Sequence, residues 1–382
     1  MDFDLTKQQK QIQKAAREFA KGEFSKDLVE ELEAKHEFPV EIAAKAGELG
    51  FIGIHFPEEY GGQAYGTLEN ALIVEEFCRR DSTLGSALLL CDFASETVLH
   101  FGTDEQKQRY LTPIAEGREF FGGAITEPDH GSDIRQMATT AVRDGDEWVL
   151  NGVKTFISNA GIAHNYMVLC QTDLEAGHKG QTMFVVPADA KGLETADIGA
   201  KMGIKLSPTG ELTFKDVRVP ASALLGKEGR GFYQVLQFFD ESRMEVAAQA
   251  LGIAQGAFDR ALAYTKKREQ FGQKIAAMQV NSHKLADMAI KLELARLVTY
   301  KACWNFDQGR LEPMVSSMAK VYAARTAVEV ADEAIQLLGG WGYMTDFEVE
   351  RFYRDAKITE IYEGTREIQK NTIASVLLGK LK

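Results

Sequence analysis

A single carboxylate near the C-terminus stands where it could act as a base. Glu363 follows the apolar residues Ile361 and Tyr362 and directly precedes Gly364. Apolar neighbours tend to raise the pKa of a carboxyl group toward that of a working base, which proton abstraction next to a carbonyl requires. Gly364 permits backbone angles that other residues avoid, and Thr365 is a suitable N-cap for the helix expected to follow. The same residues also fit an ordinary loop acid before a C-terminal helix.

Basic and glycine-rich positions in the C-terminal half could hold a nucleotide. Arg268 and Gln270 flank Glu269, and a planar guanidinium can bind a pyrophosphate through two hydrogen bonds. Gln336 stands one helical turn before Gly340, in a glycine-rich break where a nucleotide could approach the backbone. The same residues also fit a solvated surface arginine and an ordinary helix end. No GxGxxG follows a strand and opens a helix, so a dinucleotide would not be held in the Rossmann manner.

Asp92 allows two interpretations. It follows three leucines and Cys91 in a segment with a helical pattern. Asp92, Glu96 and His100 are spaced by four, as residues on the solvated face of a helix would be. Acids are rarely buried without a partner, which favours that face. The alternative is a carboxylate that lies in a pocket lined by this helix.

Apolar residues recur with helical spacing at both ends of the chain. In the N-terminal region this pattern runs from Ile12 to Phe19 and again from Leu84 to Val98. In the C-terminal region a stripe with spacings of three and four is formed by Leu285, Met288, Leu292 and Ala295. Long helical patterns without interruption favour a helix bundle.

The middle of the chain has a different pattern of short strands. β-branched and aromatic residues fill the pieces Tyr166–Cys170, Met183–Val186 and Leu212–Val219. We therefore expect an α+β fold that is mostly α. It comprises an N-terminal helical domain (1–118), a small β-barrel-like middle domain (119–228) and a C-terminal four-helix-bundle domain (229–382).

Composition and charge narrow the class of protein. With 382 residues the chain can form two or three domains, and its net charge of −12 argues against a nucleic-acid partner. The four cysteines are far apart without CxxC spacing, which predicts reduced thiols and no metal site. The N-terminus lacks the apolar core of a signal peptide, and no run of about 18 apolar residues exists. We expect a cytoplasmic protein without a membrane span.

Five segments, in order along the chain, resemble the acyl-CoA dehydrogenase family. They are Gly123–Asp133 (GAITEPDHGSD), Asn151–Asn159 (NGVKTFISN), Arg268–Gly272 (REQFG), Gln336–Gly342 (QLLGGWG) and Ile361–Gln369 (IYEGTREIQ). The resemblance spans nearly the whole chain. It implies the order helical domain, β domain, helical bundle.

The resemblance implies roles for residues in and between these segments. Glu363 matches the catalytic base of the family, and its backbone amide is expected to donate to the thioester oxygen. The positions that match flavin contacts are Ile125, Thr126, Phe156, Ser158, Arg268, Gln270, Phe271, Gln336, Gly340 and Thr365. The positions that match acyl-CoA contacts are Ser132, Asp240, Arg243 and Gly364.

Two positions depart from the common pattern of the family. Phe156 and Ser158 are two apart in a strand-like run, so they are expected to share one face that covers the flavin and donates to its N5. Many members have Trp and Thr at these positions, and both exchanges keep a ring and a hydroxyl. A subset of the family has its catalytic glutamate at the position of Ser242. Glu241 is displaced from that position by about 100° around a helix, so Glu363 remains the expected base.

The resemblance therefore predicts a FAD-dependent acyl-CoA dehydrogenase that produces an enoyl-CoA. Glu363 would take the α proton while the β hydrogen leaves as hydride to flavin N5. The implied electron acceptor is electron-transferring flavoprotein. A homotetramer is expected, because in the family the arginine at position 268 reaches the cofactor of one subunit, whereas Gln336 and Gly340 serve that of its neighbour.

Two alternatives of other kinds stay open. An acyl-CoA oxidase would share the fold, the cofactor and the base, but its reduced flavin reacts with oxygen; the modest length of this chain argues against the larger oxidases. A noncatalytic member that only binds acyl-CoA or flavin would be favoured by loss of the base or by a basic surface, and the chain shows neither.

Asp92 supports one hypothesis about the substrate, whose chain length and ring nature the sequence leaves open. The acyl group would be short or cyclic, for example cyclohexane- or cyclohexenecarboxyl-CoA. An enoyl thioester is also acidic at its γ carbon, and abstraction there needs a second base farther from the thioester than Glu363. A carboxylate at position 92 could supply it, with its pKa raised by the surrounding leucines.

Overall fold

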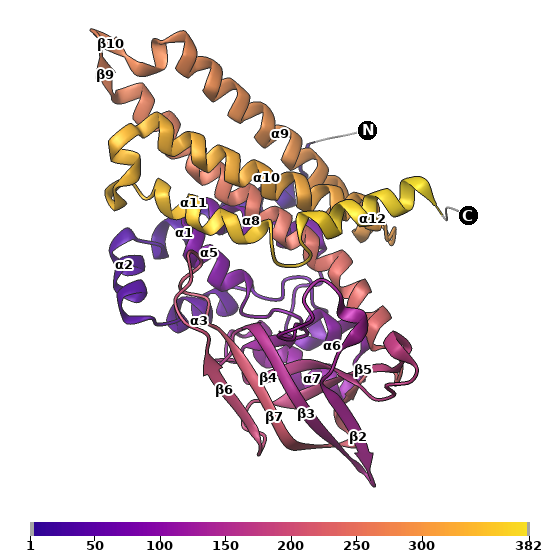
Figure 1. Cartoon of the computed structure of the whole chain (residues 1–382). Helices are drawn as coiled ribbons and strands as arrows, with labels where there is room; N and C mark the ends of the chain where they lie inside the picture. Colours follow the sequence, from indigo (N-terminus) through magenta and orange to yellow (C-terminus); the bar gives the residue numbers. More distant parts are fainter. Residues whose placement is uncertain (1–3, 380–382) are drawn as a thin grey trace.

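A computed structural model describes residues 4–379, with a helical bundle at one end and a β sheet at the other (Figure 1). The N-terminal elements are α1 (Lys7–Glu23), α2 (Lys26–Lys35), α3 (Val40–Glu48), the 3-10 turn η1 (Glu58–Tyr60), α4 (Thr67–Arg80), α5 (Ser82–Leu89), α6 (Glu96–Phe101) and α7 (Asp104–Ala115). Thr6 and Thr103 start α1 and α7 with capping boxes, in which a glutamine three residues later binds back to the threonine amide.

The helix expected from Leu84 to Val98 is broken, so the prediction of one continuous helix is wrong. Residues 90–95 form turns between α5 and α6. The Asn159 side chain donates to the Leu90 carbonyl at 2.5 Å, and the Phe121 amide donates to the Cys91 carbonyl at 2.9 Å. The Cys91 carbonyl is thereby bound by strand β1 instead of by the next helical turn, and the Leu90 carbonyl is shared with Asn159, which ends the helix.

The middle of the chain forms one eight-stranded sheet. Its elements are β1 (Phe121–Ala124), η2 (Ile134–Gln136), β2 (Thr140–Asp144), β3 (Glu147–Ser158), β4 (Asn165–Gln171), η3 (Gly177–Gly180), β5 (Gln181–Pro187), β6 (Leu193–Asp197), β7 (Thr209–Pro220), η4 (Ala221–Ala223) and β8 (Leu224–Leu225). The strand order is β6-β7-β3-β2-β4-β5-β8, and β1 pairs with β4 in parallel.

Both faces of strand β4 are buried, which explains its apolar run. Tyr166 and Val168 pack into the core of the sheet, whereas Met167 and Leu169 pack into the core of the N-terminal helices. The sheet is thereby fixed to the helices that precede it in the chain.

Long helices make up the C-terminal region. Its elements are α8 (Gly231–Lys267), β9 (Glu269–Gln270), β10 (Gln273–Lys274), η5 (Ile275–Ala277), α9 (Gln279–Asp307), α10 (Pro313–Leu338), η6 (Gly339–Tyr343), η7 (Thr345–Phe347), α11 (Val349–Thr359) and α12 (Arg366–Leu378). The predicted apolar stripe is confirmed for Met288, Leu292 and Ala295, which are at most 3% exposed, whereas Leu285 is only partly buried against the same core. Figure 1 shows α8, α9 and α10 side by side, with the β9–β10 hairpin at the end of the bundle far from the sheet.

The predicted class, mostly helical with a β domain between two helical domains, is confirmed. The α7 helix ends at Ala115, β8 ends at Leu225 and α8 begins at Gly231. The divisions 1–118, 119–228 and 229–382 remain our proposal for the domain limits. All four cysteines are free and buried.

Among residues 4–379, no helix is long and apolar enough to cross a membrane. The cytoplasmic location stays a prediction.

Candidate active site

Glu363 lies in the turn that connects α11 to α12. Its backbone adopts a left-handed conformation with φ of 51°, and Gly364 follows with φ of 89°. The Thr365 hydroxyl accepts a hydrogen bond from the Ile368 amide and caps α12, as its residue type predicts. A left-handed non-glycine residue persists only where its surroundings enforce that conformation.

Two side chains hold the carbonyl groups of this turn. The side-chain amide of Gln369 donates to the carbonyls of Glu363 at 2.8 Å and of Gly364 at 3.1 Å. The Lys320 ammonium group donates to the Gly364 carbonyl at 2.6 Å. The φ of 89° at Gly364 is one that side chains rarely allow, and a β carbon there would also lie 2.6 Å from the Gln369 side-chain nitrogen, so the turn favours glycine.

The Glu363 carboxylate is half-buried and contacts α8. The Ser242 hydroxyl donates to Glu363 Oε2 at 2.5 Å. Burial raises the pKa of Glu363, and the nearby Glu96 raises it further. The Ser242 hydroxyl and the charges of Lys320 and Arg243 offset only some of this effect. Such a carboxylate is a stronger base than one in water.

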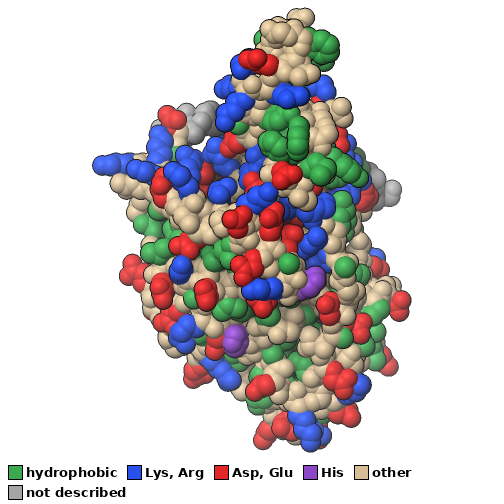
Figure 2. All heavy atoms as spheres, turned by 90° about the vertical axis from the view of Figure 1, so that its left-hand side faces the viewer, with side chains coloured by type: hydrophobic (Ala, Val, Ile, Leu, Met, Phe, Trp, Pro, Cys, Tyr) green, Lys and Arg blue, Asp and Glu red, His purple; other side chains and the backbone are tan. Residues whose placement is uncertain are grey.

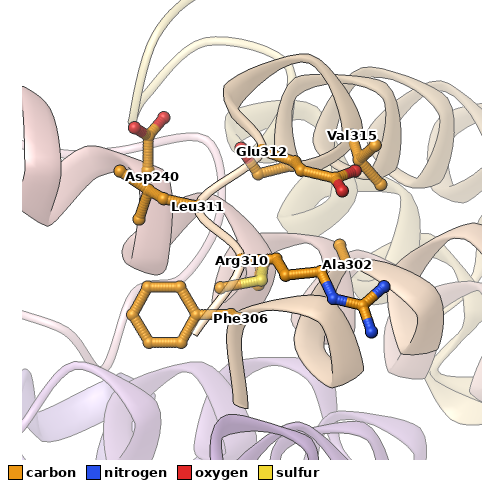
Figure 3. Close-up of a pocket in the computed structure, with 9 residues that line it drawn as sticks. Asp240, Ala302, Phe306, Arg310, Leu311, Glu312 and Val315 are labelled. Atoms are coloured by element: carbon orange, nitrogen blue, oxygen red, sulfur yellow. The ribbon is translucent and has the colours of Figure 1, made fainter. Parts of the chain in front are cut away.

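Asp240 and Arg243 form a buried ion pair one helical turn apart on α8. Arg243 Nη1 lies 2.6 Å from Asp240 Oδ1. Burial raises the pKa of Asp240 although Arg243 opposes this, and Arg243 Nε is buried without a hydrogen-bond partner. Figure 3 shows Asp240 beside Leu311 of the α9–α10 connection, at a hollow of about 10 Å³ that Arg310 also lines and that has room for one water.

The solvated face proposed for Asp92, Glu96 and His100 is wrong. Asp92 lies in the turns before α6 and is half-buried, and Glu96 is only 2% exposed. Burial raises the pKa of Asp92 to about 7, and the neighbouring Glu96 adds to this. His55 and the backbone amides of Asp92 and Gly53 oppose it. The spacing of four did not describe one helix face, because the helix is broken there.

Two histidines join this group of acids. The buried His55 side chain places Nε2 3.7 Å from Glu96 Oε1, and neither of its ring nitrogens has a hydrogen bond. His100 Nε2 lies 2.6 Å from Glu241 Oε2 and is partly exposed. Burial lowers the pKa of His55, but Glu96, Glu241 and Asp92 outweigh it and the net shift is upward. His55 was not predicted; a lone histidine in an apolar segment was its only local signal.

Segments 125–126 and 154–158 lie side by side, as the resemblance implied for a flavin subsite. The Thr155 amide donates to the Thr126 carbonyl at 2.9 Å. A register shift between Lys154 and Ile157 turns Phe156 outward with φ of 57°, so that its ring is 68% exposed. Ser158 is half-buried.

The positive charge of Lys154, which is buried next to this subsite, is neutralised by Glu127. Lys154 is fully buried, and its Nζ lies 2.8 Å from Glu127 Oε1 and 3.0 Å from the Ile125 carbonyl. An exposed ring, the Thr126 and Ser158 hydroxyls and the paired charge of Lys154 fit an uncharged planar ring system with polar edges. The residues present therefore fit an isoalloxazine.

Five other predicted cofactor positions lie elsewhere in the chain. Arg268, Gln270, Phe271, Gln336 and Gly340 are exposed around the β9–β10 hairpin and the end of α10, far from the sheet (Figure 1). Within one chain, these five residues do not lie near Phe156. The end of the molecule that carries them also exposes hydrophobic side chains, Phe271 at 93%, Trp341 at 50% and Tyr343 at 82%, and Figure 2 shows hydrophobic side chains gathered near this end.

Ser132 is exposed in the connection between β1 and β2.

Three domain models of one protein family match the chain. The N-terminal domain of acyl-CoA dehydrogenase matches residues 6–118, the middle domain matches 122–217 and the C-terminal domain matches 229–378. A short-chain-specific acyl-CoA dehydrogenase of Clostridium acetobutylicum is 41% identical, with 98% of this chain and 99% of the relative covered. An NADH-dependent acryloyl-CoA reductase of Anaerotignum propionicum is 43% identical, with coverages of 98% and 95%.

Solved structures resemble the fold closely. Butyryl-CoA dehydrogenase from Megasphaera elsdenii superimposes with a TM-score of 0.95 at 38% identity, covering 99% of this chain and 100% of that one. A chain in a structure described as the electron transferring flavoprotein of Acidaminococcus fermentans superimposes with a TM-score of 0.96 at 42% identity, and both chains are fully covered.

Proposed function

Because this chain belongs to the acyl-CoA dehydrogenase family, we propose that it removes hydrogens from the α and β carbons of an acyl-CoA, with Glu363 as the base. As a member of this family it is a FAD-dependent oxidoreductase. The observation that carries the proposal is the Glu363 carboxylate, which a fixed turn presents with a raised pKa. When bound, FAD supplies the hydride acceptor.

The residues of the turn carry out the proton chemistry. The Glu363 carboxylate takes the α proton, while the hydroxyl of Ser242 keeps that carboxylate oriented. The Glu363 backbone amide donates to the thioester oxygen and stabilises the developing enolate. The bound acyl-CoA is contacted by Ser132, Asp240, Arg243 and Gly364. The free donor of Arg243 supports this placement, because Nε has no partner within the described chain.

The cofactor is held by two sets of residues. The segments around Ile125, Thr126, Phe156 and Ser158 hold the isoalloxazine and exclude water from it. Arg268, Gln270 and Phe271 of one subunit, with Gln336 and Gly340 of another and Thr365 after the base, hold the remainder of the dinucleotide. Their distance from Phe156 within one chain supports an oligomer, for which we propose a homotetramer.

A short or cyclic acyl group is the proposed substrate. The similarity to the short-chain-specific and butyryl-CoA enzymes supports a short chain. The half-buried Asp92, with a pKa of about 7, supports a cyclic enoyl-CoA, because its carboxylate can take a γ proton that lies beyond the reach of Glu363. The electron acceptor we propose is electron-transferring flavoprotein, which the similarity to the A. fermentans structure supports.

An anaerobic panel of acyl-CoA thioesters tests the proposal. Linear, branched, cyclic and dicarboxylic thioesters are mixed with the purified flavoprotein, and bleaching of the flavin absorbance is followed. We expect bleaching by a short linear or a cyclic thioester. If no saturated or enoyl thioester bleaches the flavin, dehydrogenation is excluded. Rapid peroxide production in air would instead identify an acyl-CoA oxidase.

A further inference from the structure

A lysine is buried directly behind the turn that carries Glu363. Lys320 lies on α10, more than 40 residues before that turn, and its side chain has no exposed surface. We infer that Lys320 is a positioning residue for Glu363: its ammonium group fixes the turn and keeps a positive charge beside the carboxylate. This inference rests on the proposed role of Glu363 as base.

The first role follows from the hydrogen bond to the Gly364 carbonyl. Glu363 and Gly364 are both left-handed, with φ of 51° and 89°, and a glutamate keeps this strained conformation only where its surroundings enforce it. Lys320 binds the Gly364 carbonyl at 2.6 Å from α10, and Gln369 binds the same carbonyl from α12. Each fixes the peptide group between Gly364 and Thr365, one residue after the base, so the turn that carries the carboxylate is held from two separate helices.

The second role follows from the charges around Lys320. Glu363 in the turn, Glu360 at the end of α11 and Glu367 on α12 favour its charged form. Burial and Arg243 on α8 oppose it, and burial is the larger effect, so the pKa of Lys320 falls to about 7. Around Glu363 itself, Lys320 and Arg243 favour the carboxylate, whereas burial and Glu96 favour the protonated acid.

A neutral donor would hold the Gly364 carbonyl equally well. A neutral side chain such as glutamine avoids the desolvation penalty that a buried ammonium group carries. The presence of a lysine here therefore indicates a role for its positive charge. We assign that role to the interaction with the Glu363 carboxylate, whose ionised form Lys320 favours. Below about pH 7 Lys320 carries its charge, and there it keeps the base ionised until the substrate proton arrives.

Two substitutions separate the two roles. Lys320→Gln keeps a donor for the Gly364 carbonyl and removes the charge, whereas Lys320→Met removes both. Loss of the charge raises the pKa of Glu363, so the rise of kcat with pH moves to higher pH by about one to three units in both variants. Lys320→Met also loses about 10²-fold in the kcat reached at high pH, because the base is no longer aimed. In Lys320→Gln, KM for acyl-CoA stays unchanged, because the retained donor still holds the Gly364 carbonyl.

The control variant is Lys215→Gln, which removes an exposed lysine paired with Glu194 on the sheet. Its pH profile is expected to match that of the unaltered protein. Flavin content and melting temperature are measured for every variant, so that loss of fold is recognised. If Lys320→Gln does not fold, Lys320→Arg tests the same inference, because the retained charge must leave the profile in place.

The outcomes distinguish this inference from the proposed function. A Lys320→Gln variant with full flavin content and an unshifted pH profile would overturn the role of Lys320, and so would an upward shift in Lys320→Arg. If Glu363→Gln retains full turnover, the base itself is wrongly assigned. An inactive Glu363→Gln together with an unshifted Lys320→Gln overturns the inference alone.

Discussion

At the scale of single residues, the proposed chemistry depends on the opposing effects that set the pKa of the Glu363 carboxylate. Glu363 is partly removed from water, which raises its pKa, while Ser242 donates to one of its oxygens at 2.5 Å and keeps it oriented. Ser242 occupies the position where a subset of the family has its catalytic glutamate, and the contact places that position directly beside the Glu363 carboxylate. Positions 242 and 363, which are far apart in sequence, therefore lie in contact at the same place in the site.

Glu363→Gln is expected to abolish turnover while flavin content and acyl-CoA affinity stay nearly intact. The amide keeps the shape but cannot accept a proton, and loss of general-base catalysis typically lowers the rate by about 10² to 10⁴. In the unaltered protein, kcat should fall as the pH drops through the raised pKa of Glu363, because the protonated acid is inactive. Stopped-flow flavin reduction by substrate measures both effects.

Glu175→Gln, in the exposed connection between β4 and η3, is the matched control, since Glu175 lies outside the proposed site. Anaerobic reduction of Glu363→Gln at the unaltered rate would exclude Glu363 as the base. Glu241, which is hydrogen-bonded to His100, would then be the next candidate.

Asp92→Asn is expected to destroy oxidation of a cyclohexenecarboxyl-CoA and to leave the melting temperature unchanged. The pKa of Asp92 is raised to about 7, so activity on this substrate should appear as the pH rises through about 7 and be lost below it. Only the ionised carboxylate can take the γ proton. Flavin bleaching measured across pH 5.5 to 8.5, roughly the range around that pKa, checks this expectation.

Asp189→Asn, at an exposed position of the sheet region, serves as the control for Asp92. Equal activity of Asp92→Asn and the unaltered protein on every thioester of the panel would remove Asp92 from the chemistry. It would then be a buried acid of the network that includes His55 and Glu96.

At the scale of elements, buried ion pairs fix the segments that carry the site. Lys154 on β3 binds Glu127 and the Ile125 carbonyl, which ties the segment after β1 to the strand that presents Phe156. Glu127 also accepts hydrogen bonds from the amides of Ala138 and Thr139. Burial raises the pKa of Glu127, but Lys154 and these amides outweigh it and keep the carboxylate charged.

Lys154→Met is expected to destabilise the fold and to lower flavin retention together. Removing one partner leaves Glu127 buried without its counter-charge, which costs about 3 to 5 kcal/mol. Thermal unfolding and the flavin-to-protein absorbance ratio measure the two effects. The double variant Lys154→Met/Glu127→Gln should recover some of the stability, because no unpaired charge remains. Unchanged melting temperature and flavin content in Lys154→Met would contradict this account.

At the scale of the whole molecule, the predicted cofactor residues are divided between two ends. The proposed isoalloxazine subsite lies on the sheet, whereas Arg268 and Gln336 lie at the end of the bundle that carries the β9–β10 hairpin (Figure 1). That end exposes the Phe271 and Tyr343 rings. An assembly that brings this end of one chain to the sheet of another would complete the site and cover the rings.

Arg268→Ala is expected to weaken flavin binding and to loosen the oligomer in parallel. Loss of a charge-assisted contact to a pyrophosphate lowers affinity by about tenfold or more. Flavin occupancy after dilution and mass in solution by light scattering measure the two consequences. Arg218→Ala on the exposed sheet, where Arg218 pairs with Asp144 and Glu147, is the control. Full occupancy and an unchanged mass in Arg268→Ala would indicate an ordinary surface arginine.

Local sequence determined the features that depend on neighbours within a few residues. The apolar stripe on α9, the cap at Thr365 and the need for glycine after Glu363 all follow from helical periodicity and allowed backbone angles. The helix–sheet–helix order followed from the same signals together with the family motifs.

Only the tertiary structure decided which distant side chains meet the base and the second acid. Lys320 and Ser242 reach Glu363 from two other helices, and His55 and Glu96 surround Asp92. The break at residues 90–95 has the same origin, because Asn159 and Phe121 bind carbonyls that the local pattern had assigned to a helix. Hydrogen bonds and desolvation act through space, so they leave no periodic signal along the chain and override local propensity where the elements meet.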